Sequence, residues 1–183
     1  GRAEVAADCV FVGHGISAPE VKFDEYAHVD VKGKAVFLFS GVPWGRDTPG
    51  WVPAGADVSR YETLSYKARQ AAARGAVGVF VVDNPAGWRK QVGASEELRL
   101  PDPGVPLPTS IPVVHITREA FCRLATLSPE EVRNLARDIA KDREPQSQSL
   151  RGRRVRFRCE VSGTPLLGRN IIGVLPGRDV RLR

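Results

Sequence analysis

Residues 67–82, KARQAAARGAVGVFVV, contain the clearest fold signal in the sequence. Its first half continues an apolar stripe at helical spacing, which predicts a helix over about residues 63–74. Gly75 is well placed as the left-handed residue that ends this helix. Residues 77–82 then form an almost wholly apolar run, and so do residues 34–40 before the helix, as is typical of strands covered on both faces. This order predicts a parallel strand pair joined by a right-handed crossover.

Further elements extend this unit in both directions along the chain. Short apolar runs predict strands, and an alternation of apolar and charged residues predicts a strand with one exposed, basic face. Thr117 and Ser128 are suited to cap two helices, the second with a proline in its first turn. We expect strands at 9–13, 111–116, 155–161 and 170–175, helices from Thr117 to about Leu124 and from Ser128 to before Pro145, and a polar connector at 146–149.

Length and composition indicate one globular domain. The chain has 183 residues, of which 42% are apolar and 26% are charged, so it is long enough to bury a sizeable core. No apolar run approaches the ~20 residues of a membrane span, and we expect none. The sequence shows no export signal. Because it also contains no methionine, we interpret it as a piece of a longer or processed protein.

The positive charge is concentrated at one end of the sequence. The net charge is +6, and residues 151–183 contain nine arginines against Glu160 and Asp179. A basic end of this kind can bind nucleic acid or an acidic partner. It can also be a solvated strand face followed by a tail. We favour the second interpretation and expect no nucleic acid partner.

Two long stretches, residues 41–61 and 84–110, are predicted to be neither helix nor strand. They are rich in proline and glycine, and they leave the two ends of one strand–helix–strand unit. Loops of this length in a compact domain are usually functional or disordered. Their tryptophans either contact a ligand or pin each loop to the core. As candidate substrate-binding or partner-binding residues we take Trp44, Arg46, Trp51, Trp88 and Arg89.

The histidines His14, His28 and His115 do not form a catalytic set in the sequence. A hydrolytic triad needs a nucleophile, a base and a carboxylate within reach of one another, and no Gly-x-Ser-x-Gly elbow is present. His115 lies within a predicted strand and His14 in a turn, so we interpret both as structural. His28 and Asp30 form the His-x-Asp pair of several zinc exopeptidases, but no second histidine motif accompanies it. We expect no catalytic residue and no metal site.

The cysteines do not form a disulfide framework. Cys9, Cys122 and Cys159 are widely spaced and odd in number, so at most one bridge can form. Because Cys122 and Cys159 occupy apolar positions, we expect buried free thiols.

Four passages, taken in order, are similar to one known family: Val10–Pro19 (VFVGHGISAP), Asp24–Val36 (DEYAHVDVKGKAV), Lys67–Val79 (KARQAAARGAVGV) and Ile111–Thr117 (IPVVHIT). They resemble the protease-associated domain of secreted zinc aminopeptidases, whose relatives include aminopeptidase Y, the transferrin receptor and glutamate carboxypeptidase. The similarity spans roughly residues 9–177. His28 and Asp30 fall within this accessory passage and not within the peptidase metal motif.

The resemblance implies a mixed α/β fold, with strands forming an open barrel or sandwich-like mixed sheet flanked by helices. It implies a protease-associated domain at residues 1–167, followed at 168–183 by a segment that leads into a peptidase domain. The zinc ion is expected in that peptidase domain and not here. The implied role is that of a non-catalytic lid over the cleft, with the peptidase domain and peptide or protein substrates as partners. The implied location is secreted, periplasmic or at the cell surface.

Two alternatives remain open. The chain can be an autonomous module that binds peptides, glycans or proteins without a peptidase, and the residues encoded after Arg183 separate the two because a His-x-Asp there favours the peptidase. As a second alternative, the chain can be a small hydrolase that uses His14 or His115. We further expect the strand at 170–175 either to dock onto its own domain or to associate between chains through its edge.

Overall fold

The computed structural model describes residues 2–45, 50–52, 57–85 and 110–160. The predicted strand at 170–175 and the proposed boundary at residue 168 lie outside these residues and stay predictions. So does the self-association of that strand.

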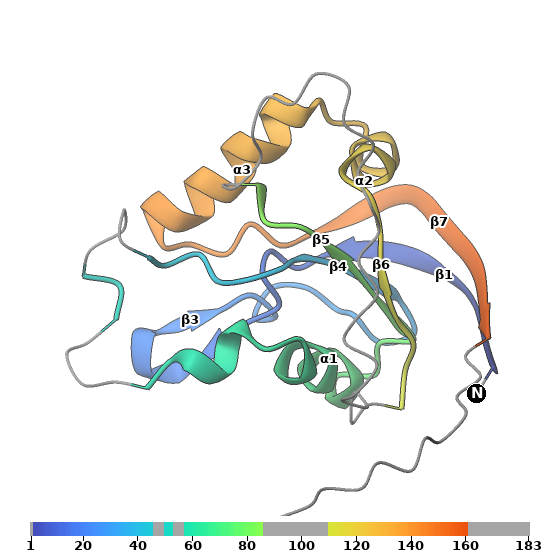
Figure 1. Ribbon diagram of the computed structural model, residues 1–183, viewed down its shortest axis with the longest axis horizontal. Coiled ribbons are helices and arrows are strands. Elements are labelled where there is room, and N and C mark those ends of the chain that lie inside the picture. Colours follow the sequence, from blue (N-terminus) through green and yellow to red (C-terminus); the bar gives the residue numbers. More distant parts are fainter. Residues whose placement is uncertain (1, 46–49, 53–56, 86–109, 161–183) are drawn as a thin grey trace, which may run out of the picture.

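A five-stranded mixed sheet forms the centre of the fold (Figure 1). Its strands stand in the order β6-β5-β4-β1-β7. The first four of these are mutually parallel, and β7 runs antiparallel to β1. Among the described residues the sheet is open and not closed into a barrel, so the expected mixed sheet flanked by helices is confirmed. The strands are β1 (Arg2–Phe11), β4 (Ala35–Phe39), β5 (Gly78–Val82), β6 (Val113–His115) and β7 (Gln148–Glu160).

Helices cover both faces of the sheet, with α1 on one side and α2 and α3 on the other (Figure 1). They are α1 (Leu64–Ala73), α2 (Arg118–Ala125) and α3 (Pro129–Asp142). The predicted caps are present, because Thr117 Oγ1 accepts a hydrogen bond from Ala120 N and Ser128 forms a capping box with Glu131. Gly75, with φ +81°, adopts the left-handed conformation expected after α1. No helix among the described residues is long and apolar enough to cross a membrane.

The core lies in two layers on either side of β4, as its unbroken apolar sequence predicted. Phe37 belongs to the layer beneath α2 and α3, where its ring stacks on that of Phe80 with centroids 4.6 Å apart. Val36 and Leu38 belong to the layer that includes Ala71 of α1. Alternate residues of one strand therefore serve opposite layers.

Short elements follow β1 and β4 along the chain. The short strands β2 (Ser17–Ala18) and β3 (Phe23–Asp24) pair with each other, and the 3-10 turn η1 (Pro19–Val21) connects them. A second 3-10 turn, η2 (Ser59–Glu62), precedes α1.

Two expectations about where strands begin need correction. The predicted polar connector at 146–149 is wrong for Gln148 and Ser149, which belong to β7, and β1 begins seven residues earlier than predicted. Both differences have one cause: β1 and β7 pair along nearly their whole length, from Arg2 opposite Glu160 to Phe11 opposite Gln148. Cys9 and Cys122 are buried free thiols, whereas Cys159 is also free but only partly buried.

Candidate functional site at the carboxyl edge of the sheet

The parallel strands β1, β4, β5 and β6 end at one edge of the sheet, which we call the carboxyl edge. Ser40 follows β4 and donates its amide hydrogen to Val82 O at 2.8 Å, and Ser40 Oγ accepts from Asn84 N at 3.0 Å. The turns after β4 and β5 are thereby joined. The stretches 41–61 and 84–110 both begin at this edge, because β4 and β5 are parallel neighbours.

Glu25 is a fully buried carboxylate that holds the turn after β1. Its Oε1 and Oε2 lie 2.8 and 2.9 Å from His14 N, and its Oε2 also accepts from Ile16 N at 2.9 Å. Gly13 has φ +54°, and a Cβ atom there would lie 1.8 Å from Glu25 Oε1. Glycine is therefore required at position 13 both for the backbone conformation and for the space.

Lys67 is a fully buried cation on the inner side of α1. Its Nζ donates to His14 O at 2.5 Å and to Gly41 O at 2.6 Å. The ammonium group thus ties the turn after β1 to the turn after β4. His14 is held from both sides, its amide by Glu25 and its carbonyl by Lys67.

Glu25 and Lys67 are both fully buried, and the charge of each stabilises the charged form of the other. Burial raises the pKa of Glu25, while the amides of His14 and Ile16 and the charge of Lys67 oppose that rise. Burial likewise lowers the pKa of Lys67, and the charge of Glu25 opposes this. Because each ion is hydrogen-bonded to backbone groups, the pair supplies partners for polar atoms that burial would otherwise leave unsatisfied.

The three histidines lie in three different settings. His14 is buried in its turn, and burial together with the charge of Lys67 lowers its pKa to about 3. Its Nδ1 lies 3.4 Å from Ser40 O. His115 lies in β6, where burial lowers its pKa. His28 is exposed, and Asp30 near it accepts from Lys32 N at 3.0 Å. The described residues contain no group of three or more potential metal ligands.

Two of the candidate binding residues belong to an aromatic cluster beside the carboxyl edge. Trp51 is 5% exposed, and its Nε1 donates to Ala140 O of α3 at 2.7 Å. Trp44 is half-buried, with ring centroids 5.5 Å from Trp51 and 5.8 Å from Tyr61. The indole of Trp51 fixes its loop to α3, and a binding role for both tryptophans stays a prediction. The other candidates lie outside the described residues: Arg46, Trp88 and Arg89.

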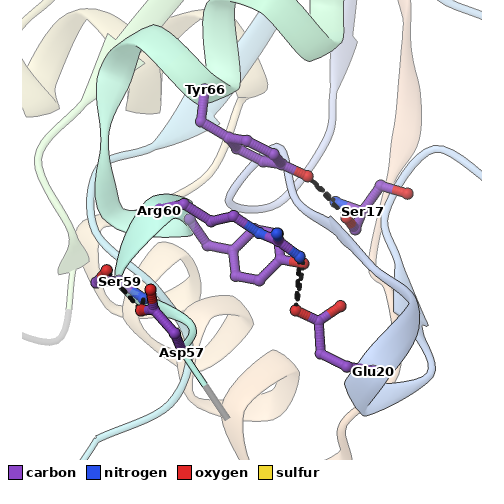
Figure 2. A network of polar contacts seen from close by, with 7 residues as sticks. Ser17, Glu20, Asp57, Ser59, Arg60 and Tyr66 are labelled. Atoms are coloured by element: carbon purple, nitrogen blue, oxygen red, sulfur yellow. Dashed lines mark hydrogen bonds and ion pairs between the residues drawn. The ribbon is translucent and has the colours of Figure 1, made fainter.

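A surface network joins η1 to η2 next to this cluster (Figure 2). Glu20 Oε1 accepts from Tyr61 Oη at 2.6 Å and from Arg60 Nη2 at 2.9 Å. The hydrogen bond from Tyr61 is the main reason that the pKa of Glu20 is lowered. Tyr66 Oη donates to Ser17 O at 2.7 Å. The network orients Tyr61, whose ring packs against Trp44 and Tyr66.

Sequence reasoning missed the cluster of His14, Glu25 and Lys67. One signal was present: Lys67 lies three residues after Leu64 and four before Ala71, on the apolar stripe of α1. A lysine at a position that helical spacing buries needs a partner. No comparable signal distinguishes Glu25, because its partners are backbone groups of a turn.

One solved structure similar to this chain is an aminopeptidase from Aneurinibacillus sp. strain AM-1. The match has 21% sequence identity and a TM-score of 0.37, and it covers 69% of this chain and 22% of that chain. This chain thus corresponds to about a fifth of the length of the aminopeptidase. No curated protein matches the sequence.

The profile of the PA domain family matches residues 3–124, which is more than half of the chain. The matched range begins in β1 and ends in α2, and it includes the whole cluster of His14, Glu25 and Lys67. The chain therefore belongs to the PA domain family, whose members typically serve as accessory domains in proteases and occur in secreted or extracellular proteins.

Proposed function

We propose that this domain is a non-catalytic accessory domain of a zinc-dependent, aminopeptidase-like protein that acts outside the cytoplasm. In this proposal the carboxyl edge lies over the approach to the peptidase cleft and shapes substrate access. The partners are the peptidase domain and the peptide or protein substrate.

The observation that carries this proposal is that the buried ions at the carboxyl edge bind backbone atoms. Glu25 and Lys67 bind backbone atoms of the turns after β1 and β4. Catalytic acids and bases must reach a substrate proton directly or through a water molecule, whereas both of these side chains are fully buried. Their arrangement supports a rigid edge that presents a surface.

The pairing of the first and last described strands, β1 and β7, supports attachment to a larger protein at one point. Arg2 of β1 lies opposite Glu160 of β7, so the two ends of the described domain lie side by side. At about 3.3 Å per residue, a strand the length of β1 places the carboxyl edge roughly 30 Å from that point. A host domain joined through both strands would meet a projecting edge able to reach across its surface.

The zinc ion of the proposal belongs to the peptidase domain. There it would act as a Lewis acid and activate a water molecule for attack on the peptide bond. The described residues of this chain do not fit such a role, since no three potential ligands gather among them.

The test compares the complete protein with a variant in which residues 2–160 are replaced by a short Gly-Ser linker. Both are assayed with leucine p-nitroanilide and with a decapeptide that begins with leucine. The proposal predicts a shift of at least about tenfold in the ratio of kcat/KM between the two substrates. An unchanged ratio contradicts the access role.

A point variant provides a second test in case the deletion variant does not fold. Trp44→Ser alters a half-buried side chain at the carboxyl edge, and we expect it to shift the same ratio in the same direction. If the intact protein hydrolyses neither substrate in the presence of zinc, an autonomous binding module replaces the proposed function.

A further inference from the structure

β7 is an outer strand with an unusual charge pattern. Among the described residues its one neighbour in the sheet is β1, and no described strand pairs with its other edge, which we call the open edge. Arg154, Arg156 and Arg158 alternate with half-buried apolar residues and are exposed. Such an edge presents unpaired backbone N–H and C=O groups that can accept a further strand.

The register between β7 and β1 shows which residues of β1 lie opposite these arginines. Asp8 lies opposite Arg154, and Glu4 lies opposite Arg158. Arg156 lies opposite Ala6 and has no acidic residue directly across from it. Because opposite charges in directly facing positions stabilise strand pairs, the exposed face of β7 matches a neighbour with acidic residues at alternate positions.

The same pattern argues against two other occupants. A second copy of β7 would place arginine rows next to each other, and like charges in cross-strand positions are destabilising. A nucleic acid backbone would meet Glu4 and Asp8 on the same exposed face. An extended acidic peptide avoids both problems.

We propose that the open edge of β7 binds an extended acidic segment of a partner protein as an additional strand. The backbone of the segment pairs with β7 along residues 154–160, beyond the irregularity between Asp8 and Cys9. Its alternate carboxylates lie beside Arg154, Arg156 and Arg158. Strand addition of this kind takes affinity from main-chain hydrogen bonds and specificity from alternate side chains.

The test measures binding of a fluorescein-labelled peptide of about eight alternating glutamate and valine residues, a length typical of a strand. Fluorescence anisotropy with this chain is expected to give a Kd below about 1 mM that weakens with added salt. Arg156→Glu should weaken binding at least about tenfold, since attraction becomes repulsion. Arg137→Glu, on the exposed side of α3, serves as the matched control and should bind like the natural sequence.

Peptide controls separate strand addition from attraction by charge alone. A peptide with lysine in place of glutamate should not bind. A peptide N-methylated at every second residue keeps its charge but loses main-chain donors, and it too should fail. Equal binding of the N-methylated peptide, or equal weakening by Arg156→Glu and Arg137→Glu, would overturn the proposal.

Two further outcomes identify the rejected occupants. Tighter binding of a thymidine oligonucleotide, with the same dependence on Arg156, would assign the strand to nucleic acid. Formation of a dimer that Arg156→Glu strengthens, together with no peptide binding, would assign the edge to a second copy. Circular dichroism of Arg156→Glu and of Arg156→Gln confirms that the variants are folded.

Discussion

The carboxyl edge and the paired strands β1 and β7 both contain acidic and basic side chains, but the two sets differ in burial and in what they bind. At the carboxyl edge Glu25 and Lys67 are fully buried and bind the backbone of neighbouring turns. Along β7 the arginines are exposed to water. Removing one of two interacting buried charges leaves the other uncompensated, whereas an exposed pair contributes little. The first region specifies a backbone conformation, and the second sets the character of a surface.

Lys67→Met tests the buried side of this comparison and should have the largest effect. It removes the positive charge that acts on Glu25 and leaves His14 O and Gly41 O without their donor. We expect a loss of about 3–5 kcal/mol in the free energy of unfolding, measured by urea denaturation. Lys34→Met is the control, because Lys34 Nζ lies 3.7 Å from the largely exposed Asp30, and its effect should stay within about 1 kcal/mol. Similar losses for both variants would remove the distinction.

Gly13→Ala tests whether the turn after β1 is built around Glu25. The new Cβ would overlap Glu25 Oε1, so the carboxylate must leave its amide partners. We expect a loss of about 3 kcal/mol or more. Gly33→Ala has a similar φ of +70° but nothing within 4 Å of the new Cβ, so it should cost only about 1 kcal/mol. Equal costs in thermal denaturation would show that backbone strain alone governs position 13.

His14 makes the stability of the buried region depend on pH. Its pKa is lowered from 6.5 to about 3 in the folded protein, so its contribution is present above pH 6.5 and is lost as the pH falls toward 3. Between pH 6.5 and 5 the natural sequence should lose up to about 2 kcal/mol relative to His14→Gln. The raised pKa of Glu25 gives stability a pH dependence of the opposite sign. Because Glu25 is present in both proteins, its contribution cancels from the difference in unfolding free energy. A difference independent of pH would contradict the burial of the imidazole.

Trp51→Phe tests the anchor that joins the first long loop to α3. The change removes the hydrogen bond from Trp51 Nε1 to Ala140 O and leaves part of a buried site empty. We expect a loss of about 2 kcal/mol. Trp44→Phe is the matched control, because Trp44 Nε1 has no hydrogen-bond partner among the described residues, and its cost should be smaller. The reverse order in denaturation would refute the anchoring role.

Arg158→Ser tests the exposed side and should have the smallest effect on stability. Arg158 lies opposite Glu4 on the solvated face of β7. The change in unfolding free energy should stay within about 0.5 kcal/mol, and a double-mutant cycle with Glu4→Ser should give a coupling below about 1 kcal/mol. A coupling of several kcal/mol would place this pair in the same class as Glu25 and Lys67.

The parts of the fold that were predictable are those determined by neighbours in sequence. The helix α1, its end at Gly75, the strand β5 and the capping box of Ser128 follow from local spacing and turn chemistry. The first seven residues of β1 and the start of β7 were not predictable, because pairing between distant segments and not apolar sequence makes them strands.

The candidate site shows the same limit more sharply. Its location at one edge of the sheet follows from the parallel order of β4 and β5, which the sequence predicts. Its central contacts do not, since Glu25 and Lys67 meet the turns after β1 and β4 only when the fold is complete. A charged residue on an apolar stripe indicates that a buried partner exists, but it does not identify that partner.

The most direct test of the account is native-state hydrogen exchange at the amides of His14 and Ile16. Both lie in a turn, and both donate to the Glu25 carboxylate. The account predicts that they exchange as slowly as core amides of β4 and that Glu25→Ala accelerates them far more than it accelerates those of β4. Rapid exchange at both positions in the natural sequence would contradict it, because the buried ions would then not be holding the edge together.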